Sequence, residues 1–326
     1  MSFKKPFKLD DNFTGMSFDI TEPHAAKAED GRITVEQGLA IVLNQLKALG
    51  RRPRTIESYD YIFTKFIESS EIEYVDELNA ELFYHYIESL DVALSTKLIR
   101  VKTIKAVLSR MLQNKLIAYN FWEGVQVSVD KSVKESAEEN DLMLLLNLID
   151  KTTFVGYRDA CAILLIYRTG LRLNTIGQLR ESHVNFDTLE LILDGRIMKG
   201  RDMLKLPIDQ QVADNLRQLI KANDEVRSFK GTNNDYLFIT ARGDSIINNE
   251  IHTNVISKQL SKYAKEYGLK NISAHAIRRA FAKRLLNQGA SVPLISKALG
   301  HKDLSTTTRY LHLDADEVSN NLRDYL

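Results

Sequence analysis

The sequence has little cysteine and proline and no long apolar run. Its 326 residues include a single cysteine, Cys161, and five prolines. One cysteine excludes an intramolecular disulfide and any multi-cysteine metal site, and it is typical of a reducing compartment. No apolar run approaches the roughly 20 residues that cross a bilayer, and no apolar region follows the basic N-terminal residues. We therefore predict a globular cytoplasmic protein without membrane contact, with Cys161 in its core.

Several motifs of nucleotide and hydrolase chemistry are also missing. The chain has no G-x-x-x-x-G-K-[ST], H-E-x-x-H or G-x-S-x-G sequence and no dinucleotide fingerprint. These absences exclude ATP-driven, zinc-peptidase and serine-hydrolase chemistry from the expected functions.

Positive charge gathers in two stretches, although the formal net charge of the chain is only +1. Residues 97–115 carry six Lys/Arg and residues 267–302 carry seven, and neither stretch contains an acidic residue. A solvated surface usually mixes both signs, because unpaired like charges repel one another. Runs of one sign therefore indicate a polyanionic partner.

Apolar spacing divides the chain into two structured parts. Residues 1–31 are polar and aperiodic, which is typical of a flexible tail or short arm. Residues 32–127 have apolar residues at helical spacing and predict a helical bundle. The charged segment 128–140 is interpreted as a linker, and residues 141–326 as a second domain.

The second domain is predicted to combine helices with a hairpin. Helical patterns cover 141–149 and 158–179, and further helices follow toward the C-terminus. Between them the alternation of leucines at 189, 191 and 193 and the turn signal Asp194-Gly195 predict strands. In the first domain, Pro53 breaks one helix and Thr55 is the expected cap of the next. The predicted fold class is mainly α with a small β-sheet.

Residues 275–313 place chemically active side chains at helix ends. A helix that begins near Ser273 is expected to carry His275 and Arg278 on one face and to stop near Gly289. A second short helix, from residue 292, ends at residue 300.

His301 directly follows Gly300, the residue that ends this second helix. Ser305 is the expected cap of a third helix, which carries Tyr310. Taken singly, Tyr310 is an ordinary packing residue, and His301 can bond exposed helix-end carbonyls. Together, however, two imidazoles, a guanidinium and a phenol favour an anion site over a metal site. Nearby cations would lower the pKa of the phenol and make it a nucleophile.

The order of these residues resembles that of the tyrosine recombinases, the phage-integrase-like family. The stretch YRTGLRLNTIGQL resembles the family's first arginine block and identifies Arg172, and MKGRDMLKLPI resembles its β-hairpin lysine block and identifies Lys199. Residues 275–313 match the H-x-x-R, L-G-H and tyrosine blocks. The resemblance covers about 138–316, and 32–127 fits the family's helical core-binding domain more loosely.

The resemblance implies a site-specific recombinase that cuts and rejoins DNA through a 3′-phosphotyrosyl intermediate, without a metal or cofactor. The second domain is then the mixed α/β catalytic domain of the family. Two arginines and a histidine would hold the phosphate, a lysine would protonate the leaving 5′-oxygen, and a second histidine would assist proton transfer from the tyrosine. The expected catalytic residues are Arg172, Lys199, His275, Arg278, His301 and Tyr310.

The resemblance further implies double-stranded recombination sites and a homotetramer acting on two of them, with integration or excision of a mobile element as the task. Accessory DNA-bending proteins are compatible with this arrangement. Residues 314–326 would pack either on a neighbouring subunit or on the rest of their own subunit. The expected DNA contacts are Lys97, Arg100, Lys102, Lys105, Arg110 and Arg279.

Two positions depart from the family pattern. Thr175 stands where an acidic residue is common, so support of Arg172 by that residue is not expected. Arg279 stands where a second histidine is common and is assigned to the DNA backbone or to packing. Two alternatives stay open: a DNA-binding accessory protein without catalysis, and a type IB topoisomerase.

Overall fold

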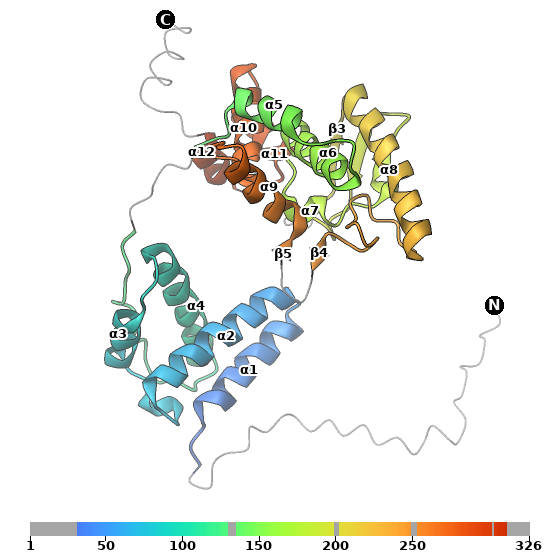
Figure 1. Ribbon diagram of the computed structural model, residues 1–326. Coiled ribbons are helices and arrows are strands. Elements are labelled where there is room, and N and C mark those ends of the chain that lie inside the picture. The colour runs from blue at the N-terminus through green and yellow to red at the C-terminus, as the bar shows by residue number, and fades with distance from the viewer. Residues whose placement is uncertain (1–30, 130–134, 199–201, 249–252, 302, 312–326) are drawn as a thin grey trace, which may run out of the picture. The chain divides into compact units, whose positions relative to one another are not determined.

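The computed structural model describes residues 31–129, 135–198, 202–248, 253–301 and 303–311 (Figure 1), without the side chains of Asn248, Thr253, Arg309 and Tyr310. The predicted N-terminal tail and residues 314–326 therefore lie outside the described residues. The chain divides into two compact units, Met1–Lys131 and Ser132–Leu326. Among the described helices, none has the length and apolar character that a bilayer crossing requires.

Helices surround an aromatic core in the first unit. The ring of Phe66 lies 5.4–5.7 Å from the rings of Phe63, Phe83 and Tyr86. The expectation that Thr55 caps a helix is wrong. The helix begins at Pro53, two residues before Thr55, because proline lacks an N–H and fits the first helical position. The described elements are α1 (Val35–Ala48), α2 (Pro53–Ser70), the 3-10 turn η2 (Val75–Glu77), α3 (Ala80–Ser89) and α4 (Leu94–Gln113).

The second unit packs helices around a small antiparallel sheet, which confirms the predicted fold class and hairpin. In the sheet, β2 (Glu190–Leu193) pairs with β1 (Val184–Asn185) on one side and β3 (Leu204–Pro207) on the other. A second ladder joins β4 (Ile247–Asn248) and β5 (Thr253–Asn254). The helices are α5 (Glu139–Leu148), α6 (Phe154–Thr169), α7 (Leu173–Ile176), α8 (Gln210–Lys230), α9 (Val255–Glu266), α10 (Ala274–Asn287), α11 (Val292–Ala298) and α12 (Leu304–Leu311), and η3 (Glu181–His183) is a 3-10 turn.

Helix α6 runs through the core of this unit and ends sharply. Thr153 caps its start by accepting from the Gly156 N–H at 3.1 Å, and Gly170 ends it at a φ of 65°. The prediction of one continuous helix over 158–179 is therefore wrong, because Gly170 adopts the left-handed conformation and turns the chain. As a result, Arg172 stands as the residue before α7 rather than in mid-helix.

Cys161 lies on α6 and is buried, as expected. Burial raises the pKa of its thiol to about 12, so the group stays protonated at neutral pH and acts as a small apolar residue.

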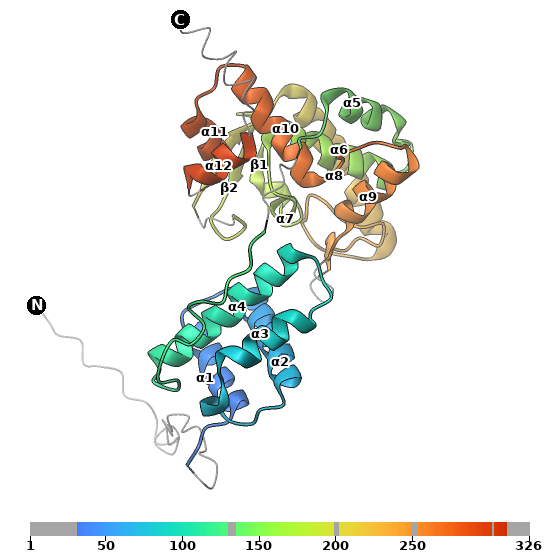
Figure 2. The same cartoon turned by 90° about the vertical axis from the view of Figure 1, so that its left-hand side faces the viewer.

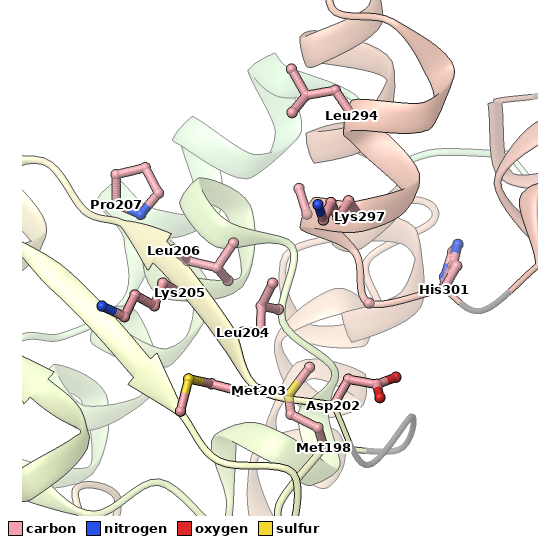
Figure 3. Close-up of a pocket in the computed structure, with 12 residues that line it drawn as sticks. Met198, Asp202, Met203, Leu204, Lys205, Leu206, Pro207, Leu294, Lys297 and His301 are labelled. Carbon is pink, nitrogen blue, oxygen red and sulfur yellow. The ribbon is translucent and has the colours of Figure 1, made fainter.

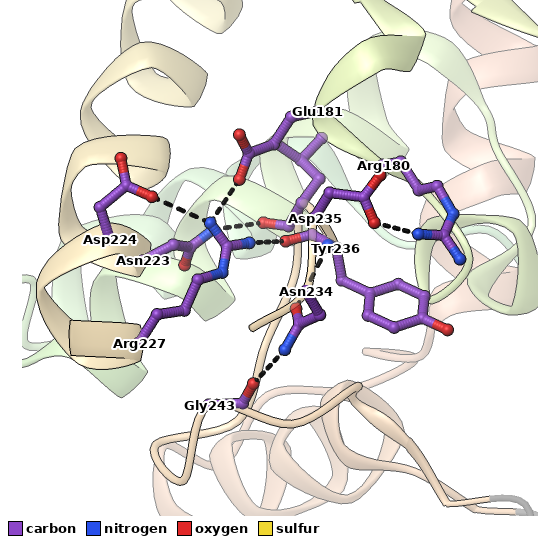
Figure 4. A network of polar contacts seen from close by, with 10 residues as sticks. Arg180, Glu181, Asn223, Asp224, Arg227, Asn234, Asp235, Tyr236 and Gly243 are labelled. Atoms are coloured by element: carbon purple, nitrogen blue, oxygen red, sulfur yellow. Dashed lines mark hydrogen bonds and ion pairs between the residues drawn. The ribbon is translucent and has the colours of Figure 1, made fainter. Parts of the chain in front are cut away.

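An arginine-centred network fastens α8 to the segment beside the sheet (Figure 4). Arg227 donates to Glu181 and Tyr236 O, both at 2.6 Å, and to Asp224 at 3.0 Å. Because Arg227 is buried, these acceptors offset the cost of removing its charge from water. The network holds the frame from which the β2–β3 hairpin projects.

Two glycine-to-alanine variants test why the turn at the end of α6 requires glycine. Gly170 and Gly231 end α6 and α8 with the same φ of 65°, but a Cβ at position 170 would lie 2.3 Å from Phe281 Cδ1, whereas position 231 has open space. We expect Gly231→Ala to lower the free energy of unfolding by about 1 kcal/mol, the cost of the left-handed conformation. Gly170→Ala should cost about 1–3 kcal/mol more, since it also overpacks the core. Urea unfolding of the two variants checks this, and equal losses would contradict it.

Candidate functional site

Two arginines that are distant in sequence meet at the C-terminal end of α11. Arg172 Nη1 donates to the carbonyls of Leu299 and Gly300, both at 3.3 Å. Arg278 Nη2 donates to the same Leu299 carbonyl at 2.6 Å, and its Nη1 donates to the carbonyl of Gly170. Arg278 is buried and Arg172 half-buried. The shared carbonyl thus brings two guanidinium groups together.

Local sequence explains how α10 and α11 end at this place. Ser273 caps α10 by accepting from the Ala276 N–H at 3.2 Å, and Gly289 follows its end at a φ of 84°. Gly300 follows α11 at a φ of 60°, and a Cβ there would lie 3.0 Å from Met198 Cε. The predicted helix start near Ser273 and the stops at Gly289 and Gly300 are confirmed. In both Figures 1 and 2, α10, α11 and α12 lie side by side.

His301 is held through both ring nitrogens. Its Nε2 lies 3.0 Å from Arg278 Nη2, and its Nδ1 lies 2.8 Å from Thr307 Oγ1. Thr307 is fully buried on α12. The sequence analysis missed Thr307, because nothing in the run STTTRY distinguishes one threonine from its neighbours; only its spacing of six residues from His301 was available as a signal.

Helix α12 carries Tyr310, whose side chain lies outside the described part of the structure. The helix begins where the Asp303 carboxylate accepts from the N–H of Ser305 at 2.9 Å and from its hydroxyl at 2.6 Å. The expectation that Ser305 is the cap is therefore wrong, because the carboxylate two residues earlier takes that role. At the other end, Leu311 is buried with Ile295 of α11. These contacts fix the backbone that bears Tyr310.

Of two further predicted catalytic residues, the structure describes His275 but not Lys199. His275 is exposed in the first turn of α10, three residues before the buried Arg278. The structure thus brings Arg172, Arg278 and His301 together.

A cavity of about 540 Å³ opens beside His301, between the β2–β3 hairpin and α11 (Figure 3). In Figure 3, Lys205 comes from the hairpin side and Lys297 from α11. Both lysines are exposed, and so is Asp202, which also lines the cavity, so charges of both signs lie at its mouth. Its apolar lining includes Met198, Leu204, Leu206, Leu294 and Ala298.

Polar contacts hold the start of the loop that connects β2 to β3. The Asp194 carboxylate accepts from the Arg196 side chain at 2.9 Å and from the Arg196 N–H at 2.7 Å, and these bonds lower the pKa of Asp194 to about 2. Thr175 is buried, and its hydroxyl donates to the Ile197 carbonyl at 3.4 Å. The chain is thus held just before position 199.

The basic residues of α4 have different surroundings. Lys97 donates to the Ile87 carbonyl at 3.0 Å, and Lys105 donates to the Glu123 carbonyl at 3.3 Å. Arg100 lies beside the phenol of Tyr86, where its charge lowers the pKa that burial raises. Lys102 is exposed, and Arg110 is half-buried. Some of the positively charged residues of this stretch therefore serve to pack their own unit.

Arg279 binds the end of the predicted linker. Its Nε and Nη2 donate to the carbonyl of Glu135 at 2.9 and 2.6 Å. The Ala137 N–H donates to the Ala276 carbonyl at 3.1 Å, and Ala137 is buried. Of the two assignments considered for Arg279, these contacts favour packing. Residues 135–137, part of the predicted linker, are fastened to the helix that carries Arg278.

The sequence also matches known proteins. The model of the phage integrase family matches residues 135–317. Tyrosine recombinase XerD of Chlamydia trachomatis is 24% identical over 287 residues, which cover 85% of this chain and 91% of XerD. Tyrosine recombinase XerC of Anoxybacillus flavithermus is 24% identical over 272 residues, which cover 81% of this chain and 88% of XerC.

Solved structures share the fold. The Tn1549 transposon integrase in complex with transposon right end DNA aligns with a TM-score of 0.69 at 17% identity, covering 90% of this chain and 99% of the integrase chain. XerH site-specific recombinase bound to palindromic difH substrate aligns with a TM-score of 0.63 at 20% identity, covering 89% of this chain and 84% of XerH.

The Arg279 contact predicts a change in linker protection. In Arg279→Ala, the Ala137 amide should exchange with solvent roughly tenfold faster, because loss of a charged hydrogen bond costs on the order of 1.5 kcal/mol. Arg279→Lys keeps the charge but not the paired N–H groups, so it should behave like the alanine variant. Hydrogen exchange read at Ala137 measures this. Wild-type protection in both variants would show that Arg279 does not hold the linker.

Proposed function

The chain belongs to the phage integrase family and is a tyrosine site-specific recombinase, and from this premise we propose that it joins itself to DNA through Tyr310. The observation that carries the proposal is the meeting of Arg172, Arg278 and His301 at the end of α11. Both arginines donate to backbone carbonyls, which orient the guanidinium groups. Two oriented positive charges suit the two charged oxygens of a phosphodiester in reaction.

The proposed cleavage exchanges one phosphate ester for another. The Tyr310 oxygen attacks the phosphorus, the bond from phosphorus to the 5′-oxygen breaks, and a 3′-phosphotyrosyl link forms. His275 takes the phenolic proton, and Lys199 gives a proton to the leaving 5′-oxygen. Arg172, Arg278 and His301 stabilise the charge on the non-bridging oxygens. The roles of Lys199 and His275 rest on the family resemblance.

Rejoining runs the same step in reverse with a different strand. A free 5′-hydroxyl attacks the phosphotyrosyl link and releases the phenol, so the ester energy is conserved and no nucleotide is consumed. Exchange between two duplexes takes four cleavages, which supports a homotetramer on two recombination sites. We assign integration or excision of a mobile element as the task, the first unit as a core-site DNA-binding domain and the second unit as the catalytic domain.

A nicked suicide duplex tests the nucleophile. Wild-type protein should form a covalent adduct that survives a denaturing gel, and Tyr310→Phe should form none, because the attacking oxygen is gone. Arg278→Ala should lower the adduct yield at least a hundredfold, since one oxyanion donor is worth about that much.

Other outcomes have defined meanings. Adduct formation by Tyr310→Phe would refute the nucleophile assignment, and binding without adduct in the wild type would favour the accessory protein. Relaxation of supercoils without strand exchange would favour the type IB topoisomerase.

The exposed Lys102 should contribute to DNA affinity through charge. We expect Lys102→Ala to weaken binding and to reduce the slope of log K against log salt by about one, as loss of one phosphate contact does. Lys65→Ala is the matched control, because Lys65 is a surface lysine of the same unit that pairs with Glu68 at 2.6 Å. Filter binding over a salt series measures both variants, and equal slopes would argue against α4 as a DNA contact.

A further inference from the structure

The two contacts of His301 determine where its ring proton lies. A guanidinium nitrogen donates hydrogen bonds and accepts none, so the 3.0 Å contact with Arg278 requires a lone pair on His301 Nε2. In the neutral ring the proton then lies on Nδ1. It points to Thr307 Oγ1, 2.8 Å away, and the hydroxyl oxygen accepts it. The ring is thus held in one tautomer and one orientation.

Thr307 is placed to connect His301 to the nucleophile's helix. It is fully buried, and it lies three residues before Tyr310 on α12. Leu311 fixes the same helix by packing in the cluster that contains Ile295 and Leu299. Because Thr307 and Leu311 are four residues apart, they lie on one face of α12, which is held by a hydrogen bond to His301 and by apolar packing.

We propose that Thr307 is a positioning residue of the recombination reaction: it accepts from the Nδ1–H of the His301 tautomer that Arg278 sets, and it ties that ring to the helix that carries Tyr310. The catalytic part of this inference rests on the proposed function, whereas the tautomer part does not. With Nδ1 bound to Thr307, Nε2 accepts from Arg278 in the neutral ring, and it donates to a phosphate oxygen when the ring carries both protons. The hydroxyl also accepts from Nδ1–H when the ring carries both protons, so the orientation is kept in either form.

Four variants separate this role from general packing. Thr307→Val removes the hydroxyl with little change of volume, and Thr307→Ser keeps the hydroxyl. Thr308→Val is the matched control, because Thr308 is exposed on the same helix and its hydroxyl donates to the Leu304 carbonyl at 3.1 Å. His301→Asn identifies the signals of His301 among the seven histidines.

The measurement is ¹⁵N NMR of the full chain labelled at histidine, together with the cleavage rate on a suicide duplex. Wild type, Thr307→Ser and Thr308→Val should each show His301 as the Nδ1–H tautomer. Thr307→Val should keep the tautomer that Arg278 sets but lose the acceptor of Nδ1–H, so the ¹⁵N chemical shift of Nδ1 should change and cleavage should be roughly tenfold slower. Thr307→Ser should retain cleavage within about threefold of the wild type.

The two proposals fail in different ways. An Nε2–H tautomer in the wild-type protein overturns the inference even if Thr307→Val does not fold. A folded Thr307→Val protein with an unchanged Nδ1 chemical shift and an unchanged cleavage rate also overturns it. The predicted tautomer in a wild-type protein that forms no adduct leaves the hydrogen-bond assignment standing and refutes the proposed function instead.

Discussion

The site depends on one backbone carbonyl. Leu299 O accepts from Arg172 and from Arg278, although Arg172 and Leu299 are separated by 127 residues in sequence. Two guanidinium groups at one place repel each other unless negative charge lies between them. The C-terminal end of a helix supplies partial negative charge through its unpaired carbonyls, and Leu299 stands at the end of α11. The backbone thus offsets part of the repulsion between the two guanidinium groups.

A second helix end contributes to the same arginine. Gly170, which ends α6, gives its carbonyl to Arg278, so the buried guanidinium lies between the C-terminal ends of two helices. This arrangement explains the demand for glycine at position 170. The chain must turn at a positive φ, and it must do so against the ring of Phe281, so that the carbonyl can face α10. A helix that continued through Gly170 would carry Arg172 away from α11.

The sequence predicted the features that side chains encode, and it missed those that backbone groups supply. The start of α10 and the stops of α10 and α11 follow from Ser273, Gly289 and Gly300, and the order of charged residues identifies the family. By contrast, a carbonyl is present at every residue, so no pattern marks Leu299 as the acceptor for two arginines. The same limit applies to Lys97 and Lys105, whose charges are visible in the sequence but whose carbonyl partners are not. The break at Gly170 was missed because apolar spacing continues on both sides of it.

Thr175 shows how backbone support changes the demands on neighbouring side chains. The family resemblance leads one to expect an acidic residue at this position, three residues after Arg172, as a partner for that arginine. Here the Thr175 hydroxyl instead donates to Ile197 O, in the chain that leads to Lys199, while Arg172 is oriented by the carbonyls of Leu299 and Gly300. A carbonyl can orient a guanidinium as a carboxylate does, but without adding a negative charge. With threonine at this position, the end of α11 contributes to the orientation of Arg172, and the hydroxyl of Thr175 holds the chain between β2 and β3.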